Sequence, residues 1–128
     1  MVNPVKMPIA KVYLVGAGPG DPELLTLKAK RLIQSADVIL YDYLVHPNIV
    51  HLGQNATLIC VGKKKGAHSK TQSEIHEIML SYVGKVTSIV RLKGGDPMIF
   101  GRCGEEMALL NQHKIPFQVI PGITSAIA

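Results

Sequence analysis

The chain has 128 residues, of which 47% are hydrophobic, and it carries a formal net charge of +5. This length predicts one domain with a core of its own, and no apolar run is long enough to span a membrane. We expect no secretory signal, and two cysteines without metal-ligand spacing favour a reducing, cytoplasmic setting. The excess positive charge predicts an acidic partner: a nucleic acid, an anionic surface or a polyanionic small molecule.

Short apolar runs alternate with helical patterns along the chain. The runs predict strands at residues 11–15, 38–41, 57–61, 86–92 and 117–120. Helical patterns lie in the gaps, after Asp21, at His46-Pro47, after Thr71 and over 105–112. This alternation predicts an α/β fold, a mainly parallel five-stranded sheet with helices on both faces.

The predicted domain covers residues 11–128, after a flexible lead-in over residues 1–10. An apolar segment follows Thr124 and predicts the start of another helix at the end of the chain. We therefore expect the chain to be a fragment of a longer protein.

Local signals predict where helices begin and end. Asp21 is a good N-cap, and Pro22 suits the first helical position. Thr71 and Glu74 have the spacing of a capping box, and Gly84 fits a helix C-terminus.

The first predicted strand leads into a loop, 16–20, with the sequence Gly-Ala-Gly-Pro-Gly. A dinucleotide-binding loop needs glycine at its first, third and sixth positions. Here the third glycine is fifth and the sixth residue is Asp21, whose carboxylate would repel a diphosphate. The loop is therefore either a structural turn or a binding loop for a ligand that is not strongly anionic.

The fourth predicted strand ends in Gly94-Gly95-Asp96-Pro97. Paired glycines let a ligand approach the backbone closely, and ligands of open α/β sheets bind beyond the carboxyl ends of strands. The alternative is a plain tight turn.

Charged residues follow two other predicted strands. Asp42 is placed as a general base, or serves as a turn aspartate. A glycine-bounded loop contains three consecutive lysines, Lys63, Lys64 and Lys65. These lysines either bind an anion or are a solvated run of charges. The five histidines lack metal-ligand spacing, so no metal is expected. Aromatic residues are 5% of the chain, which gives little support to stacking on nucleic acid.

Together these motifs resemble the tetrapyrrole methylase family, and within it the uroporphyrinogen-III C-methyltransferases. The resemblance spans nearly the whole chain, in order and with the family's spacing. The matching segments are 15–22, 41–45, 61–64, 90–102, 105–106 and 119–125. The first glycine loop is shared by several members, whereas the stretch from Arg91 to Arg102 is similar to the members that act on uroporphyrinogen III.

The resemblance implies methyl transfer from S-adenosylmethionine to two ring carbons of uroporphyrinogen III, giving precorrin-2 for sirohaem and cobalamin. It also implies a homodimer of two-domain subunits with the cofactor between the domains. Because the second domain is missing after Ala128, this chain alone is expected to bind cofactor weakly and to turn over little.

The family's functional residues are carried over position by position. Its cofactor contacts fall on Pro19, Gly94, Gly95, Asp96, Ile99, Thr124 and Ser125. Its acid–base pair falls on Asp42 and Lys63. The eight carboxylates of uroporphyrinogen III fit a basic loop, so Lys64, Lys65 and Arg102 are the expected substrate contacts.

Two other interpretations remain open. One keeps the family and changes the substrate, to another precorrin or to RNA. The other is a basic anion-binding module without chemistry, such as a nucleic-acid binder. This second interpretation predicts steeply salt-dependent binding and no response to S-adenosylhomocysteine.

Overall fold

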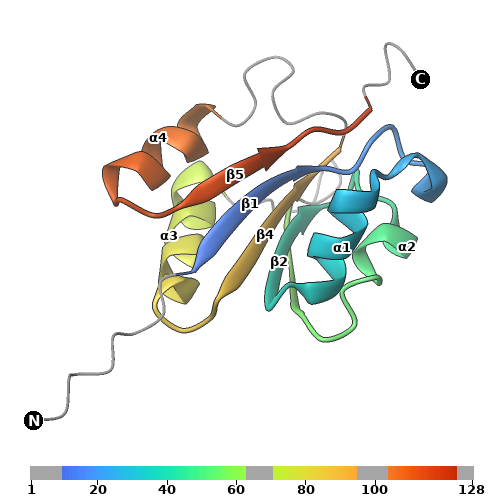
Figure 1. Cartoon of the computed structure of the whole chain (residues 1–128). Coiled ribbons are helices and arrows are strands. Elements are labelled where there is room, and N and C mark those ends of the chain that lie inside the picture. The colour runs from blue at the N-terminus through green and yellow to red at the C-terminus, as the bar shows by residue number, and fades with distance from the viewer. Residues whose placement is uncertain (1–9, 63–70, 95–103, 124–128) are drawn as a thin grey trace, which may run out of the picture.

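The computed structural model describes residues 10–62, 71–94 and 104–123, which contain one five-stranded parallel sheet (Figure 1). The strands are β1 (Lys11–Gly16), β2 (Val38–Asp42), β3 (Thr57–Gly62), β4 (Ser88–Lys93) and β5 (Phe117–Ile120). Their order across the sheet is β3-β2-β4-β1-β5, and every pair is parallel. The predicted fold class is confirmed.

Helices cover both faces of the sheet. The helix α1 (Leu27–Ser35) and the single turn α2 (Pro47–Val50) lie on one side, and α3 (Gln72–Val83) and α4 (Gly104–Gln112) lie on the other (Figure 1). The predicted helix over 105–112 and the short helix after His46-Pro47 are confirmed within a residue.

The alternation of side chains along the strands divides the core into two layers. The layer under α3 and α4 takes Val12 and Leu14 of β1, whereas Val15 belongs to the layer under α1 and α2. The same alternation sends Ile89 of β4 to the α3 side and Val90 to the α1 side. Each sheet face thus has its own apolar contact with a pair of helices.

The predicted start of the first helix is wrong by five residues. The Asp21 carboxylate accepts a hydrogen bond from the Glu23 N–H at 2.9 Å, but this cap begins only the 3-10 turn η1 (Pro22–Leu24). The chain is then extended at Leu25, and Thr26 caps α1 through the Ala29 N–H at 3.1 Å. Leu25, the extended residue between η1 and α1, packs against the core layer under α1.

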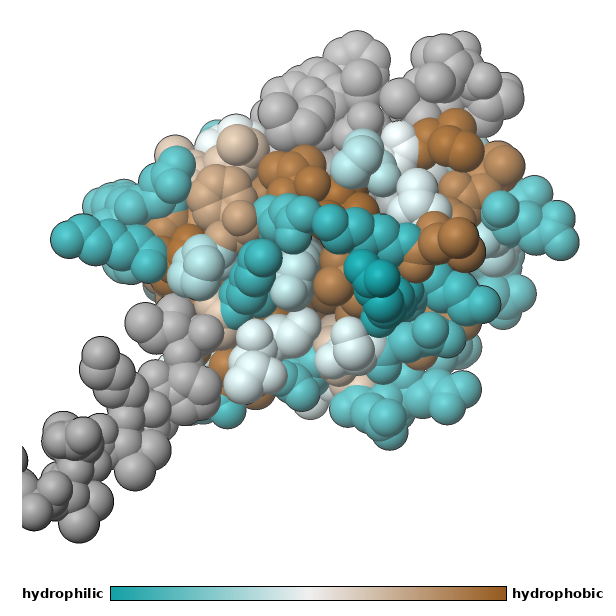
Figure 2. Space-filling view, viewed as in Figure 1, coloured by the Kyte–Doolittle hydropathy of each residue, from teal (hydrophilic) through white to brown (hydrophobic). Residues whose placement is uncertain are grey.

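The segment between β1 and α1 also carries apolar surface. Leu27, at the first position of α1, is 87% exposed. Figure 2 shows apolar atoms gathered over this segment, at the upper right of the view, where Figure 1 places the connection from β1 to α1.

The other predicted helix signals are confirmed. Thr71 and Glu74 form a complete capping box: the Thr71 N–H donates to the Glu74 carboxylate at 3.0 Å, and the Glu74 N–H donates to the Thr71 hydroxyl oxygen at 3.2 Å. Gly84 is the C-cap of α3. None of the helices in the described ranges is long and apolar enough to cross a membrane. Residues 1–9 of the lead-in predicted over 1–10, and the helix predicted after Thr124, lie outside the described residues and stay predictions. The last residue of that lead-in, Ala10, is described: it is buried, and its N–H donates to the Val83 carbonyl at 3.0 Å.

The fourth strand begins at Ser88, two residues later than predicted, because the residues before it belong to a turn tied to Asp37. One Asp37 carboxylate oxygen accepts hydrogen bonds from the Thr87 N–H at 3.0 Å, the Thr87 hydroxyl at 2.9 Å and the Ser88 N–H at 3.1 Å. The Thr87 N–H, then its hydroxyl, hold the pKa of Asp37 below its ordinary 3.8, and partial burial opposes them.

A carboxyl whose pKa is lower in the folded chain stabilises the fold above its unfolded pKa. That contribution is lost as the pH falls through the folded pKa. We expect Asp37→Ala to lower the free energy of unfolding at neutral pH by about 1 kcal/mol, a modest value because the carboxylate is exposed.

Urea unfolding at neutral pH and at about pH 3 measures the effect, and the deficit should shrink at the lower pH because the wild-type carboxyl is then becoming protonated. Glu77→Ala, at an exposed position of α3, is the control. An Asp37→Ala deficit of the same size at both pH values would contradict the assignment.

Candidate functional site

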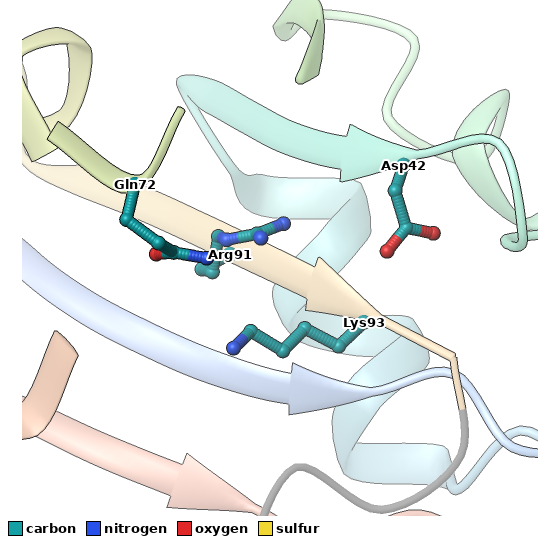
Figure 3. Close-up of a pocket in the computed structure, with 4 residues that line it drawn as sticks. All are labelled: Asp42, Gln72, Arg91 and Lys93. Atoms are coloured by element: carbon teal, nitrogen blue, oxygen red, sulfur yellow. The ribbon is translucent and has the colours of Figure 1, made fainter. Parts of the chain in front are cut away.

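A polar pocket opens where the carboxyl ends of β2 and β4 meet the first residue of α3. Its volume is about 230 Å³, and it is lined by Asp42, Gln72, Arg91 and Lys93 (Figure 3). Ligands of parallel sheets bind at this edge, because the helices that follow the strands begin there. The pocket lies on the same face of the sheet as α3 and α4.

Asp42 ends β2, and its backbone and side chain are both constrained. The pairing of β2 with β3 shifts between Tyr41 and Asp42, so that Asp42 lies opposite Gly62. Its Oδ1 accepts a hydrogen bond from the Leu44 N–H at 3.0 Å. A Cβ atom on Gly62 would lie 2.8 Å from the Asp42 Cβ, so this approach of the strands requires glycine.

The floor of the pocket is a buried ionic cluster. Arg91 and Lys93 of β4 are 5% and 6% exposed, and Glu106 of α4 is 1% exposed. One oxygen of Glu106, Oε1, accepts from Arg91 Nε at 3.3 Å and from Lys93 Nζ at 3.1 Å. The second oxygen, Oε2, is buried and has no hydrogen-bond partner among the described residues.

Two cations and one carboxylate are costly to bury, because each loses its hydration. Their mutual attraction offsets part of this cost, and so does the positive end of the α4 helix dipole near Glu106. Removing the carboxylate would leave two like charges buried side by side.

The predicted cofactor contacts Pro19 and Gly94 lie in adjacent loops. The Ala17 N–H donates to the carbonyl of Lys93 at 2.7 Å, so the loop after β1 is bonded to the end of β4. Gly18 has a positive φ of 77°, and a Cβ there would lie 3.4 Å from the carbonyl of Leu24. Pro19 itself is exposed at the tip of this loop.

The segment after β2 also approaches the end of β4, because a Cβ on Gly94 would lie 3.6 Å from the Cβ of Leu44, whose N–H donates to Asp42. The structure thus brings together Asp42, Pro19 and Gly94 at one edge of the sheet. The remaining predicted site residues lie outside the described residues: Lys63, Lys64, Lys65, Gly95, Asp96, Ile99, Arg102, Thr124 and Ser125.

The sequence did not identify four residues as part of this pocket and its ionic cluster. Arg91 and Lys93 were predicted only as parts of a motif, and no role was predicted for Gln72 or Glu106. One signal was available: Arg91 and Lys93 flank Leu92, so the strand alternation places both on the same face.

Comparison with known proteins shows that the chain is similar in sequence to one family of methylases. A family model described as Tetrapyrrole (Corrin/Porphyrin) Methylases matches residues 11–128. The chloroplastic S-adenosyl-L-methionine-dependent uroporphyrinogen III methyltransferase of Arabidopsis thaliana is 60% identical over 116 residues, which are 90% of this chain and 31% of that protein.

Solved structures are similar as well. The Thermus thermophilus uroporphyrin-III C-methyl transferase complexed with S-adenyl homocysteine gives a TM-score of 0.79 at 49% identity, over 93% of this chain and 47% of that one. A cobalt precorrin-4 methyltransferase gives a TM-score of 0.76 at 36% identity, over 90% of this chain and 46% of that one. The chain therefore spans less than half the length of these relatives.

The contact between Gly62 and Asp42 predicts a local effect of substitution. We expect Gly62→Ala to lower the free energy of unfolding by about 1–3 kcal/mol, because the added methyl group forces β2 and β3 apart. The Leu44 amide signal in NMR should shift, since its hydrogen bond to Asp42 is disturbed.

Gly84→Ala is the matched control, because a Cβ there meets nothing within 4 Å. Chemical denaturation and an amide correlation spectrum measure the two effects. A Gly62→Ala variant with unchanged stability and an unmoved Leu44 signal would show that the strands do not need glycine at this position.

Proposed function

Because the chain belongs to the tetrapyrrole methylase family, we propose that it carries the N-terminal part of a uroporphyrinogen-III C-methyltransferase that uses S-adenosylmethionine. The observation that carries this proposal is the 60% identity to the plant uroporphyrinogen III methyltransferase over 90% of the chain. The 36% identity to the cobalt precorrin-4 methyltransferase gives less support to a different precorrin substrate.

The cofactor is proposed to bind across the loops that follow β1 and β4. Pro19 and Gly94 belong to these loops, which the Ala17–Lys93 hydrogen bond joins. Gly95, Asp96, Ile99, Thr124 and Ser125 are proposed as the further cofactor contacts. The sulfonium of S-adenosylmethionine is positively charged, so backbone carbonyls exposed by the glycines would stabilise it. S-adenosylmethionine has no diphosphate, so the carboxylate of Asp21 at the end of the first loop would not repel it.

The reaction is proposed as an in-line displacement. A ring carbon of the electron-rich pyrrole attacks the methyl group, the carbon–sulfur bond breaks, and the electron pair stays on sulfur in S-adenosylhomocysteine. The ring system then loses one proton, which the Asp42 carboxylate accepts, and Lys63 is the proposed acid partner. The protein contributes mainly position, since correct alignment lowers the barrier of such a transfer.

The substrate is an acidic macrocycle, and the basic character of the chain suits it. The net charge of +5 and the proposed contacts Lys64, Lys65 and Arg102 would face its carboxylates. We also propose a homodimer in a reducing, cytoplasmic setting, which agrees with a sequence that has only two cysteines and no disulfide framework. The plant relative is named as chloroplastic.

The proposed cofactor site is expected to be incomplete in this chain, which covers less than half the length of its relatives. We expect S-adenosylhomocysteine to bind at least about tenfold more tightly to a chain extended to the relatives' length. Losing about half of the contacts with the cofactor is expected to weaken the binding free energy by roughly 1.4 kcal/mol or more, which is a factor of ten in affinity. Isothermal titration calorimetry on both chains measures the difference.

Gly95→Leu in the extended chain should remove this binding, whereas Gly84→Leu at the end of α3 should leave it unchanged. If both folded chains fail to bind S-adenosylhomocysteine and instead bind RNA with a steep salt dependence, the methyltransferase proposal fails and the anion-binding interpretation replaces it.

Asp42→Asn tests the proposed base separately from the cofactor site. We expect kcat for methylation of uroporphyrinogen III in the extended chain to fall by about 10²–10⁴-fold, with the affinity for S-adenosylhomocysteine nearly unchanged. The carboxamide keeps the shape of the side chain but cannot accept the proton. Glu77→Gln is the control, and a kcat within about twofold of wild type in Asp42→Asn would remove Asp42 from the mechanism.

A further inference from the structure

The arrangement of Arg91 goes beyond the proposed roles of Asp42 and the basic loop. Its Nε donates to Glu106 Oε1 at 3.3 Å, and its Nη1 lies 3.5 Å from the carbonyl of Leu92. The inner edge of the guanidinium is thus held by the buried carboxylate. Arg91 also lines the pocket, and Figure 3 shows its terminal nitrogens on the side where Asp42 lies.

Lys93 is oriented differently by the same carboxylate. Its Nζ lies 3.1 Å from Glu106 Oε1. In Figure 3 its side chain runs from the end of β4 away from Asp42 and back along the strand. Glu106 therefore draws the ammonium toward α4, and among the described residues that line the pocket the guanidinium of Arg91 is the cationic group on the Asp42 side.

We propose that Arg91 binds a carboxylate of the substrate in this pocket, and that Glu106 is the positioning residue that holds Arg91 for it. The inference rests on the proposed function and identifies which group of the substrate enters here. Arginine pairs with carboxylates through two parallel hydrogen bonds, which demands a fixed guanidinium plane. The contact between Nε and Glu106 provides that fixed plane.

The size and polarity of the pocket agree with a carboxylate arm. Its volume of about 230 Å³ is below the roughly 300–1,000 Å³ of sites that enclose a whole drug-sized ligand. A side arm therefore fits where the macrocycle does not. Gln72 begins α3 at the pocket wall, so an amide and the positive end of a helix dipole also face an anion there.

The opposite wall adds a second requirement on the ligand. Asp42 is a carboxylate and would repel a second one directly beside it. An uncharged group that can donate a hydrogen bond therefore suits the position next to Asp42, while the group at Arg91 is anionic. A pyrrole ring with an acidic side arm has both groups close together.

The experiment uses the methyltransferase at the full length of its relatives, with four variants: Arg91→Lys, Glu106→Gln, the double variant, and Glu105→Gln as control. Glu105 is the exposed neighbour of Glu106 on α4. We expect Arg91→Lys to raise KM for uroporphyrinogen III about tenfold to hundredfold, because lysine keeps the charge but cannot make the two parallel hydrogen bonds to a carboxylate. Glu106→Gln should raise it as well, and Glu105→Gln should not.

A positioning role has a signature that a structural role lacks. Because Glu106 acts through Arg91, Glu106→Gln should add no further increase in KM when Arg91 is already lysine. The affinity for S-adenosylhomocysteine should stay within about twofold of wild type in all variants, since the cofactor loops are unchanged. Thermal unfolding checks that each variant is folded.

The outcomes separate this inference from the proposed function. Wild-type KM in both Arg91→Lys and Glu106→Gln, or KM increases that add fully in the double variant, would overturn the inference while methylation by the wild type persists. A wild-type protein that neither binds S-adenosylhomocysteine nor methylates the substrate would instead overturn the proposed function. If Arg91→Lys or Glu106→Gln does not fold, Glu106→Asp, which keeps the buried negative charge but shortens the side chain, decides the inference: a raised KM with unchanged affinity for S-adenosylhomocysteine supports it, and a wild-type KM overturns it.

Discussion

The burial of Arg91 and Lys93 is the constraint on which the site depends. β4 lies between β2 and β1, and helices cover both faces of the sheet, so Arg91 and Lys93 are only 5% and 6% exposed where they line the pocket. Leu92 points to one core layer, and the two cations point to the other. A buried charge must be paired, so α4 has to bring Glu106 to the end of this strand.

Much of the fold could be predicted from the sequence, because its signals are local. The apolar runs, the capping box at Thr71 and the glycine after α3 each depend on residues close in the chain. The first helix shows the limit. Asp21 and Thr26 both cap a helical segment, Asp21 the turn η1 and Thr26 the helix α1, and the cap signal alone does not say which of them begins the longer helix.

The site was only partly predictable for a similar reason. Asp42 could be proposed because it follows a strand directly. Glu105 and Glu106 look alike in sequence, and only the packing of α4 on the sheet makes one exposed and the other 1% exposed. Strand order is equally hidden: alternation predicts parallel strands, but not that β4 inserts between β1 and β2 and so brings Arg91 and Asp42 into one pocket.

That insertion also governs how the chain must be made. Lys11 pairs with Ser88, and Val12 pairs with Phe117, so the first strand to be synthesised has partners that come last. The nearer of these partners, β4, begins 77 residues after Lys11, so at typical rates of synthesis β1 stays unpaired for roughly 4–15 s. During this interval β1 is a sheet edge without a neighbour, open to pairing with other chains. Expression of the protein should therefore depend on chaperones and temperature more than the stability of the finished fold would suggest.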